Sequence, residues 1–195
     1  MGYAPAVAIR PDPAPASDER GDGAHLLQQV TAAAHRVEDR YSGDADRPLG
    51  SYLGAMATYG AAVTAIVVAI RRRRTPLPER ISPGDLALMA VATHKVTRTL
   101  AKDAVTSPLR APFTRYKEPA GAGELHEEVT ATGALHGVGE LLSCPFCLAQ
   151  WVATAFVTGL VVAPRATRLA ASVFATRAGS DALQYVYAGL EERLG

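Results

Sequence analysis

The stretch from Gly50 to Ile70 constrains the fold more than any other part of the chain, because it contains no charged residue over 21 positions. As a helix rising ~1.5 Å per residue it would be about 30 Å long, which matches the hydrocarbon thickness of a bilayer. A soluble core helix of this length would normally show a polar face. Four arginines follow it, Arg71 to Arg74, and hydrocarbon does not accept such a cluster. We therefore expect a membrane-spanning helix over residues 50–70.

A second uncharged stretch runs from Leu141 to Ala163 and predicts a second span. Residues 85–105 are only half apolar, and residues 169–190 are apolar apart from Arg177 and Asp181. In the last segment Arg177 and Asp181 lie one helical turn apart and are expected to pair with each other. Both charged segments can span only if their charged faces turn towards protein or water.

The sequence thus predicts an all-α integral membrane protein with three to four transmembrane helices, at about residues 50–70, 85–105, 141–163 and 169–190. These helices form a membrane domain of residues 49–195. Before it we expect a disordered tail over residues 1–23, rich in Pro, Gly and charge. Residues 24–48 predict an amphipathic helix and a linker, because apolar residues recur there every three or four positions. The helix is expected to lie on the membrane or on the rest of the protein.

The segment between the second and third of these spans is rich in proline and glycine. Residues 106–123 hold Pro108, Pro112, Pro119, Gly121 and Gly123, and therefore predict a loop. A short polar helix is expected to follow. Arg110 in this loop is expected near the phosphates of lipid head groups.

Positive charge sets the orientation of membrane proteins. Arg71 to Arg74, together with Arg80, favour a cytoplasmic end for the first span and an external N-terminal tail. The inverted orientation, which Arg40 and Arg47 favour, stays open. With four spans Arg165 and Arg168 also fall inside, whereas they fall outside if residues 85–105 do not cross, so we prefer four spans.

Composition and charge bound the location and the partners. Arginine far outnumbers lysine and alanine is abundant, which is typical of a high-GC bacterial genome, and no cleavable signal peptide is visible at the N-terminus. We expect a multi-pass protein of the bacterial cytoplasmic membrane. Its expected partners are the lipid bilayer and either further copies of itself or another membrane protein. A net charge of +1 gives no reason to expect nucleic acid.

Cys144 and Cys147 have the spacing shared by redox dithiols and half zinc sites. A thiolate at a helix N-terminus would be stabilised by the helix dipole, but no alternating strand and helix pattern of the thioredoxin type surrounds the pair. A zinc site would need two further ligands, for which His126, His136 and His94 are candidates. The alternatives are redox chemistry, zinc as the cofactor, or two small residues packed where a span enters the membrane.

Charged side chains on the predicted helices form a second group of candidates. Charges buried in a membrane need partners or water, so an interhelical ion-pair network is the simpler interpretation. The sharper one is a pocket for an anion, such as a phospholipid head group. The residues concerned are His94, Lys95, Arg98, Lys102, Asp103, Arg110, Glu140, Arg177 and Asp181.

Three groups of residues in the C-terminal part carry a resemblance to a known family. They are His94 to Arg98, then Asp103 to Phe113, and Gly139 to Trp151 with its Cys-Pro-Phe-Cys motif. Over about residues 81–190 the chain resembles the DUF1360 family of proteins of unknown function. The resemblance implies a small bacterial membrane protein without an assigned activity.

No catalytic constellation is visible, since the chain has no glycine-rich phosphate loop, nucleophile elbow or Ser/His/Asp arrangement. We therefore lean away from an enzyme. The preferred hypothesis is a structural or binding membrane protein with an interhelical charged network. A membrane thiol-redox or zinc-binding protein and an oligomeric transporter or channel are the alternatives.

Overall fold

The computed structural model describes residues 19–42 and 49–194, and the chain divides into two compact units between Arg47 and Pro48. The first unit contains helix α1, Glu19–Ser42. The prediction of disorder is therefore wrong for residues 19–23, which form the first turns of α1 because the prolines that prevent a helix end upstream. Predicted disorder in residues 1–18 and the linker at 43–48 lie outside the described residues. Val30 and Val37 of α1 are exposed, and the surface expected to cover them stays a prediction.

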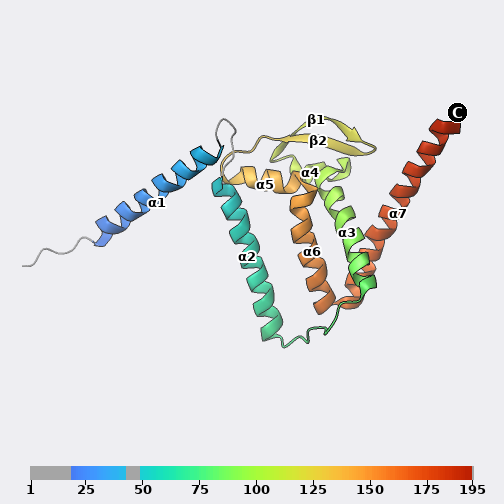
Figure 1. Ribbon diagram of the computed structural model, residues 1–195, viewed down its shortest axis with the longest axis horizontal. Helices are drawn as coiled ribbons and strands as arrows, with labels where there is room; N and C mark the ends of the chain where they lie inside the picture. The colour runs from blue at the N-terminus through green and yellow to red at the C-terminus, as the bar shows by residue number, and fades with distance from the viewer. Residues whose placement is uncertain (1–18, 43–48, 195) are drawn as a thin grey trace, which may run out of the picture. The chain divides into compact units, whose positions relative to one another are not determined.

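The second unit is built around four long helices, with shorter elements gathered at one end (Figure 1). The long helices are α2 Leu49–Arg72, α3 Pro83–Lys102, α6 Pro145–Val162 and α7 Pro164–Leu194. The shorter elements, all between α3 and α6, are η1 Ala104–Thr106, α4 Ser107–Arg110, β1 Thr114–Gly121, β2 Glu124–Val129 and α5 Ala134–Ser143.

Successive long helices run in opposite directions, which gives this unit two distinct ends (Figure 1). At the hairpin end, where α3 ends and α6 begins, lie the two strands and α5. At the arginine end lie Arg71 to Arg74 and the turn between α6 and α7. There Arg168, near the start of α7, makes a forked pair with Asp85, near the start of α3, at 2.7 and 2.8 Å.

Among the described residues, α2 and α6 are the helices long and apolar enough to cross a membrane. No residue of α2 is buried, and four of its large apolar side chains, Leu53, Met56, Val67 and Val68, are exposed. Tyr59 connects α2 to α6: its ring packs edge-on against Trp151 with centroids 5.1 Å apart, and its hydroxyl lies 2.8 Å from that of Thr154. An apolar helix this exposed is unfavourable in water and suits a lipid environment.

A small core forms where α3, α6 and α7 meet. Met89 and Ala92 of α3, Leu160 of α6 and Ala171 of α7 are buried together. The two alanines have no exposed surface, so small side chains allow close approach of the helices, as is usual in membrane bundles. A single residue outside either helix, Ala163, connects α6 to α7.

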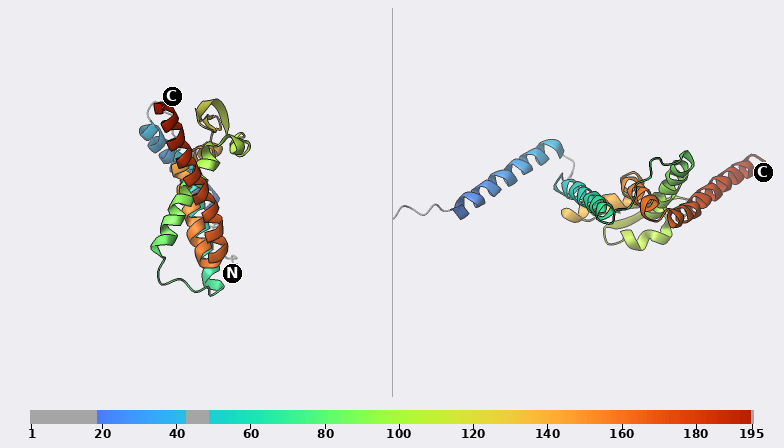
Figure 2. Two further views of the ribbon diagram at one scale, coloured as in Figure 1. Left: turned by 90° about the vertical axis from the view of Figure 1, so that its right-hand side faces the viewer. Right: turned by 90° about the horizontal axis from the view of Figure 1, so that it is seen from below.

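The all-α expectation is wrong, because residues 114–129 form an antiparallel β-hairpin at the hairpin end (Figures 1 and 2). The predicted loop over residues 106–123 contains α4 and β1. A short helix does follow it, but only after β2, as α5. Pro108 lies in the first turn of α4, and Pro119 lies in a strand of an isolated two-stranded ribbon. Both are positions where a missing N–H is tolerated. Gly123 has a φ of 77° at the turn between the strands, a conformation that glycine adopts without strain.

The predicted span at 141–163 begins later than expected. Residues 141–143 belong to α5, and Cys144, in an extended conformation, separates α5 from α6. Pro145 at the first position of α6 explains the break, since proline favours a helix start and restricts the residue before it. The other predicted helices agree with α2, α3 and α7 to within a few residues.

Candidate functional site

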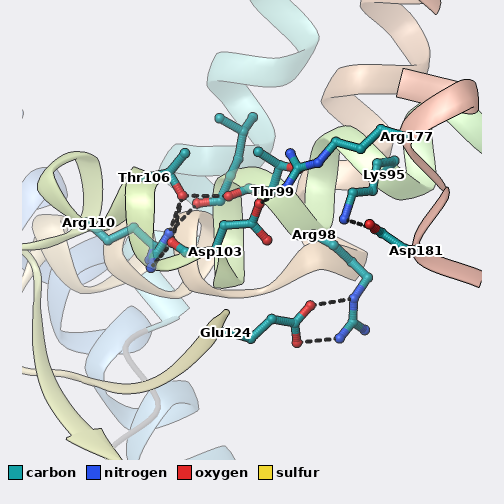
Figure 3. A network of polar contacts seen from close by, with 10 residues as sticks. Lys95, Arg98, Thr99, Asp103, Thr106, Arg110, Glu124, Arg177 and Asp181 are labelled. Atoms are coloured by element: carbon teal, nitrogen blue, oxygen red, sulfur yellow. Dashed lines mark hydrogen bonds and ion pairs between the residues drawn. The ribbon is translucent and has the colours of Figure 1, made fainter. Parts of the chain in front are cut away.

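Arg110 at the end of α4 lies at the centre of a polar network at the hairpin end, and its side chain is fully buried. Its Nε donates to the carboxylate of Glu127 on β2. Nη1 donates to the carbonyl of Leu100 at 2.7 Å and to the hydroxyl of Thr106 at 2.9 Å, and Nη2 donates to the carbonyl of Asp103 at 3.1 Å (Figure 3). The guanidinium thus supplies donors to carbonyls at the C-terminus of α3, which have no partner within the helix.

This burial overturns the expectation that Arg110 lies near head-group phosphates. The side chain is 0% exposed and Glu127 is 6% exposed, so neither reaches lipid or solvent. A buried ion pair needs further hydrogen bonds to offset desolvation, and the contacts to α3 provide them. Arg110 therefore holds α4, β2 and the end of α3 together.

A second pair connects α3 to the hairpin. Arg98 donates through Nε to Glu124 Oε1 at 3.0 Å and through Nη2 to Oε2 at 2.5 Å. This forked arrangement is the stronger form of an arginine–carboxylate contact. The backbone reinforces it, because the Ala104 N–H donates to the carbonyl of Gly123 at 2.9 Å.

Two further pairs connect α3 to α7. Arg177 donates through Nη2 to Asp103 Oδ2 at 2.6 Å and through Nη1 to the hydroxyl of Thr99 at 2.9 Å. Lys95 forms an ion pair with Asp181 (Figure 3). The expected pairing of Arg177 with Asp181 is therefore wrong. Each of the two residues has a partner on or beside α3, because α7 packs along α3 with this face inwards.

The remaining sequence candidates lie at the margin of the network or outside it. His94 is exposed beside Lys95, and Lys102 is half-buried at the end of α3; neither has an ion-pair partner within residues 19–42 and 49–194. Glu140 lies on α5, where its carboxylate is 3.4 Å from His136 Nε2. His126, on β2, contacts Glu118 across the hairpin at 3.3 Å.

The described side chains do not form a zinc site around the cysteines. In the part of the chain that the structure describes, no group of three or more His, Cys, Asp or Glu side chains is arranged to hold a metal ion. Both cysteines are free thiols. Cys144 caps α6, since its Sγ accepts a hydrogen bond from the Cys147 N–H at 3.3 Å, and the Cys147 side chain is exposed.

Sequence reasoning missed the two acids that hold the hairpin, Glu124 and Glu127. The signal available in the sequence was the two-residue period of a strand. It places Leu125 and Glu127 on one face and Glu124, His126 and Glu128 on the other. Glu127 faces the buried arginine, whereas Glu128 on the opposite face meets Lys117, and this contact lowers the pKa of Glu128.

A cleft of about 800 Å³ opens beside the network, between α3, α7 and the turn of the hairpin. Its charged lining consists of His94, Lys95, Arg98, Asp103, Glu124, Arg177 and Asp181. The ion-paired side chains therefore line a space that a small molecule can enter. Tyr185, one turn beyond Asp181 on α7, adds an aromatic wall.

The comparison with protein families matches the part of the chain that contains this network. The family described as "Protein of unknown function (DUF1360)" matches residues 88–187. Sporulation protein YjcA of Bacillus subtilis (strain 168) is 31% identical over 86 residues, which cover 43% of this chain and 73% of that protein. No solved structure matches the chain. The matched residues run from α3 to α7 and confirm the resemblance seen in the sequence, so the chain belongs to the DUF1360 family.

Proposed function

We propose that this protein is a multi-pass membrane protein of the structural or binding class, in which α2, α3, α6 and α7 cross the bacterial cytoplasmic membrane. The observation that carries the proposal is the set of four ion pairs that join α3, α4, α7 and the hairpin. Such pairs allow charged helix faces to be turned inwards while apolar faces meet lipid. The ion pairs also hold the β-hairpin at one surface of the membrane.

Two apolar helices and the alternating helix directions support the membrane placement. In the proposed orientation Arg71 to Arg74 are cytoplasmic, and the hairpin is external. The Bacillus subtilis relative is named a sporulation protein. That name describes a process for the relative and no molecular activity, so the proposal for this chain concerns membrane assembly and binding.

The test is thiol labelling in intact cells with a membrane-impermeant reagent. Cys147 is exposed at the start of α6 and reports on the hairpin end. In a chain whose native cysteines are replaced by serine, Leu77→Cys reports on the arginine end, because Leu77 is 68% exposed between α2 and α3. We expect Cys147 to be labelled in intact cells and Leu77→Cys to be labelled only after the cells are opened.

The result decides between membrane arrangements. Labelling of both positions from the same side would contradict a crossing by α3, and extraction of the protein from membranes by alkaline carbonate would contradict integration altogether. Labelling of Leu77→Cys alone in intact cells would show the inverted orientation.

A thiol-redox role is the second candidate. It is favoured by two free thiols at the start of α6, Cys144 at the N-cap and Cys147 in the first turn, at the proposed external end. Oxidation to a disulfide removes two electrons and two protons, and a disulfide of an external thiol oxidoreductase would accept them. The same labelling experiment tests this role. Cys147 should then be labelled only after reduction, whereas equal labelling with and without reductant would count against it.

A further inference from the structure

The ion pairs that line the cleft beside α3 and α7 do not expose their two partners equally. Arg98 and Arg177 are 42% and 44% exposed, whereas their carboxylate partners Glu124 and Asp103 are 15% and 9% exposed. In the third pair the order is reversed, since Asp181 is 34% exposed and Lys95 only 10%. A molecule in the cleft therefore meets two guanidiniums and one carboxylate.

The two arginines retain hydrogen-bonding capacity towards the cleft. A guanidinium has five N–H donors. Arg98 uses Nε and one Nη2 donor on Glu124, and Arg177 uses one donor each on Thr99 and Asp103. Most of their remaining donors have no partner among the described residues. Both arginines line the cleft, from two different helices, and guanidinium donors are suited to phosphate oxygens.

Asp181 supplies the opposite charge one turn beyond Arg177 on α7. Lys95 contacts this carboxylate through Oδ2, and a carboxylate has about four acceptor positions, so it can also accept from a second ammonium group. The cations and acids that line the cleft balance, apart from His94. A simple anion would compete with carboxylates already in place, whereas a zwitterion meets favourable charge at both of its ends.

We propose that this cleft binds a compact zwitterion of the phosphoethanolamine type, with the phosphate on Arg98 and Arg177 and the ammonium on Asp181. The ligand is either free or the head group of phosphatidylethanolamine. The second source rests on the proposed membrane function, because the cleft must then open at a membrane surface. The first source does not depend on it.

The experiment measures binding to the full-length protein purified in detergent. Calorimetry with phosphoethanolamine and with glycerol phosphate compares the same phosphate with and without an ammonium group. Native mass spectrometry with equimolar phosphatidylethanolamine and phosphatidylglycerol makes the same comparison for lipids. We expect at least a tenfold preference for the ammonium-bearing probe in one of the two arms, a factor equivalent to ~1.4 kcal/mol. The arm in which the preference occurs identifies the source of the ligand.

Two variants locate the binding. Asp181→Asn should remove the preference while binding of the phosphate group persists, and Arg98→Lys should weaken binding of both probes in the preferred arm. Arg168→Lys is the matched control, because Arg168 makes the same forked contact with a carboxylate outside the cleft. It should leave binding unchanged. Thermal unfolding of each variant separates loss of binding from loss of the fold.

Three outcomes would overturn the proposal. The first is equal binding of the two probes by the unaltered protein in both arms, and the second is no binding in either arm. The third is a preference that survives in a folded Asp181→Asn variant. If that variant does not fold, the preference measured on the unaltered protein still decides. Because the calorimetric arm needs no bilayer, failure of the membrane topology and failure of the ligand site are distinguishable.

Discussion

Two neighbouring glutamates at the hairpin end are expected to contribute very different amounts to the stability of the fold. Glu127 and Glu128 are neighbours on β2, yet Glu127 is buried against Arg110 and Glu128 is 57% exposed against Lys117. A buried pair that loses one partner leaves an uncompensated charge, whereas an exposed pair exchanges its partner for water at little cost.

Glu127→Gln should therefore destabilise the fold by about 3–5 kcal/mol, because Arg110 would stay buried without a counter-charge. Chemical denaturation in detergent, followed by circular dichroism, measures the loss. Glu128→Gln is the control and should leave the unfolding transition unchanged. The double variant Arg110→Met with Glu127→Leu should recover part of the loss. Equal behaviour of the two glutamine variants would mean that the Arg110 pair does not support the fold.

At the scale of elements, the contact between α5 and the base of the hairpin depends on one glycine. A Cβ added at Gly139 of α5 would lie 2.7 Å from Val129 Cγ1 and 3.2 Å from Phe113 Cβ. Val129 ends β2 and Phe113 precedes β1. Because Gly139 has no side chain, α5 can pack directly against the base of the hairpin, where β1 begins and β2 ends.

Gly139→Ala should destabilise the protein by about 1–3 kcal/mol through overpacking, since both neighbours are part of the tight hairpin base. The matched control is Gly179→Ala in α7, where an added Cβ meets nothing within 4 Å. In a helix that exchange should be neutral or slightly stabilising. Unfolding midpoints of the two variants under identical conditions test the difference, and equal midpoints would rule out the close packing at Gly139.

At the scale of the whole molecule, the proposed membrane orientation should follow the positive charge at the arginine end. Replacing Arg71 to Arg74 by Asn removes the largest cluster of positive charge, and the fraction of inverted molecules should rise. External labelling of Leu77→Cys in this background measures that fraction. As a control, Arg193→Asn removes a charge near the far end of α7 and should not invert the protein. An unchanged distribution after the fourfold replacement would show that other charges set the topology.

Helices were predictable from the sequence because their signals are local. The uncharged run from Gly50 to Ile70 predicts a long apolar helix, which is α2. Pro83 suits the first position of a helix, and α3 begins there after the capping residue Ser82. The family resemblance could likewise be recognised from residues on α3 and around Cys144. Each of these features depends on neighbours in the chain.

Pairing was decided by tertiary structure alone. The sequence identified Lys95, Arg98, Asp103, Arg110, Arg177 and Asp181 as charges in need of partners, yet it predicted a local pair between Arg177 and Asp181. In the folded chain the packing of α7 along α3 sets Arg177 on Asp103 and Lys95 on Asp181. The hairpin brings Glu124 and Glu127 to the two remaining arginines. Local spacing determines which elements form, whereas partners distant in sequence depend on how those elements pack, because an ion pair requires proximity in space.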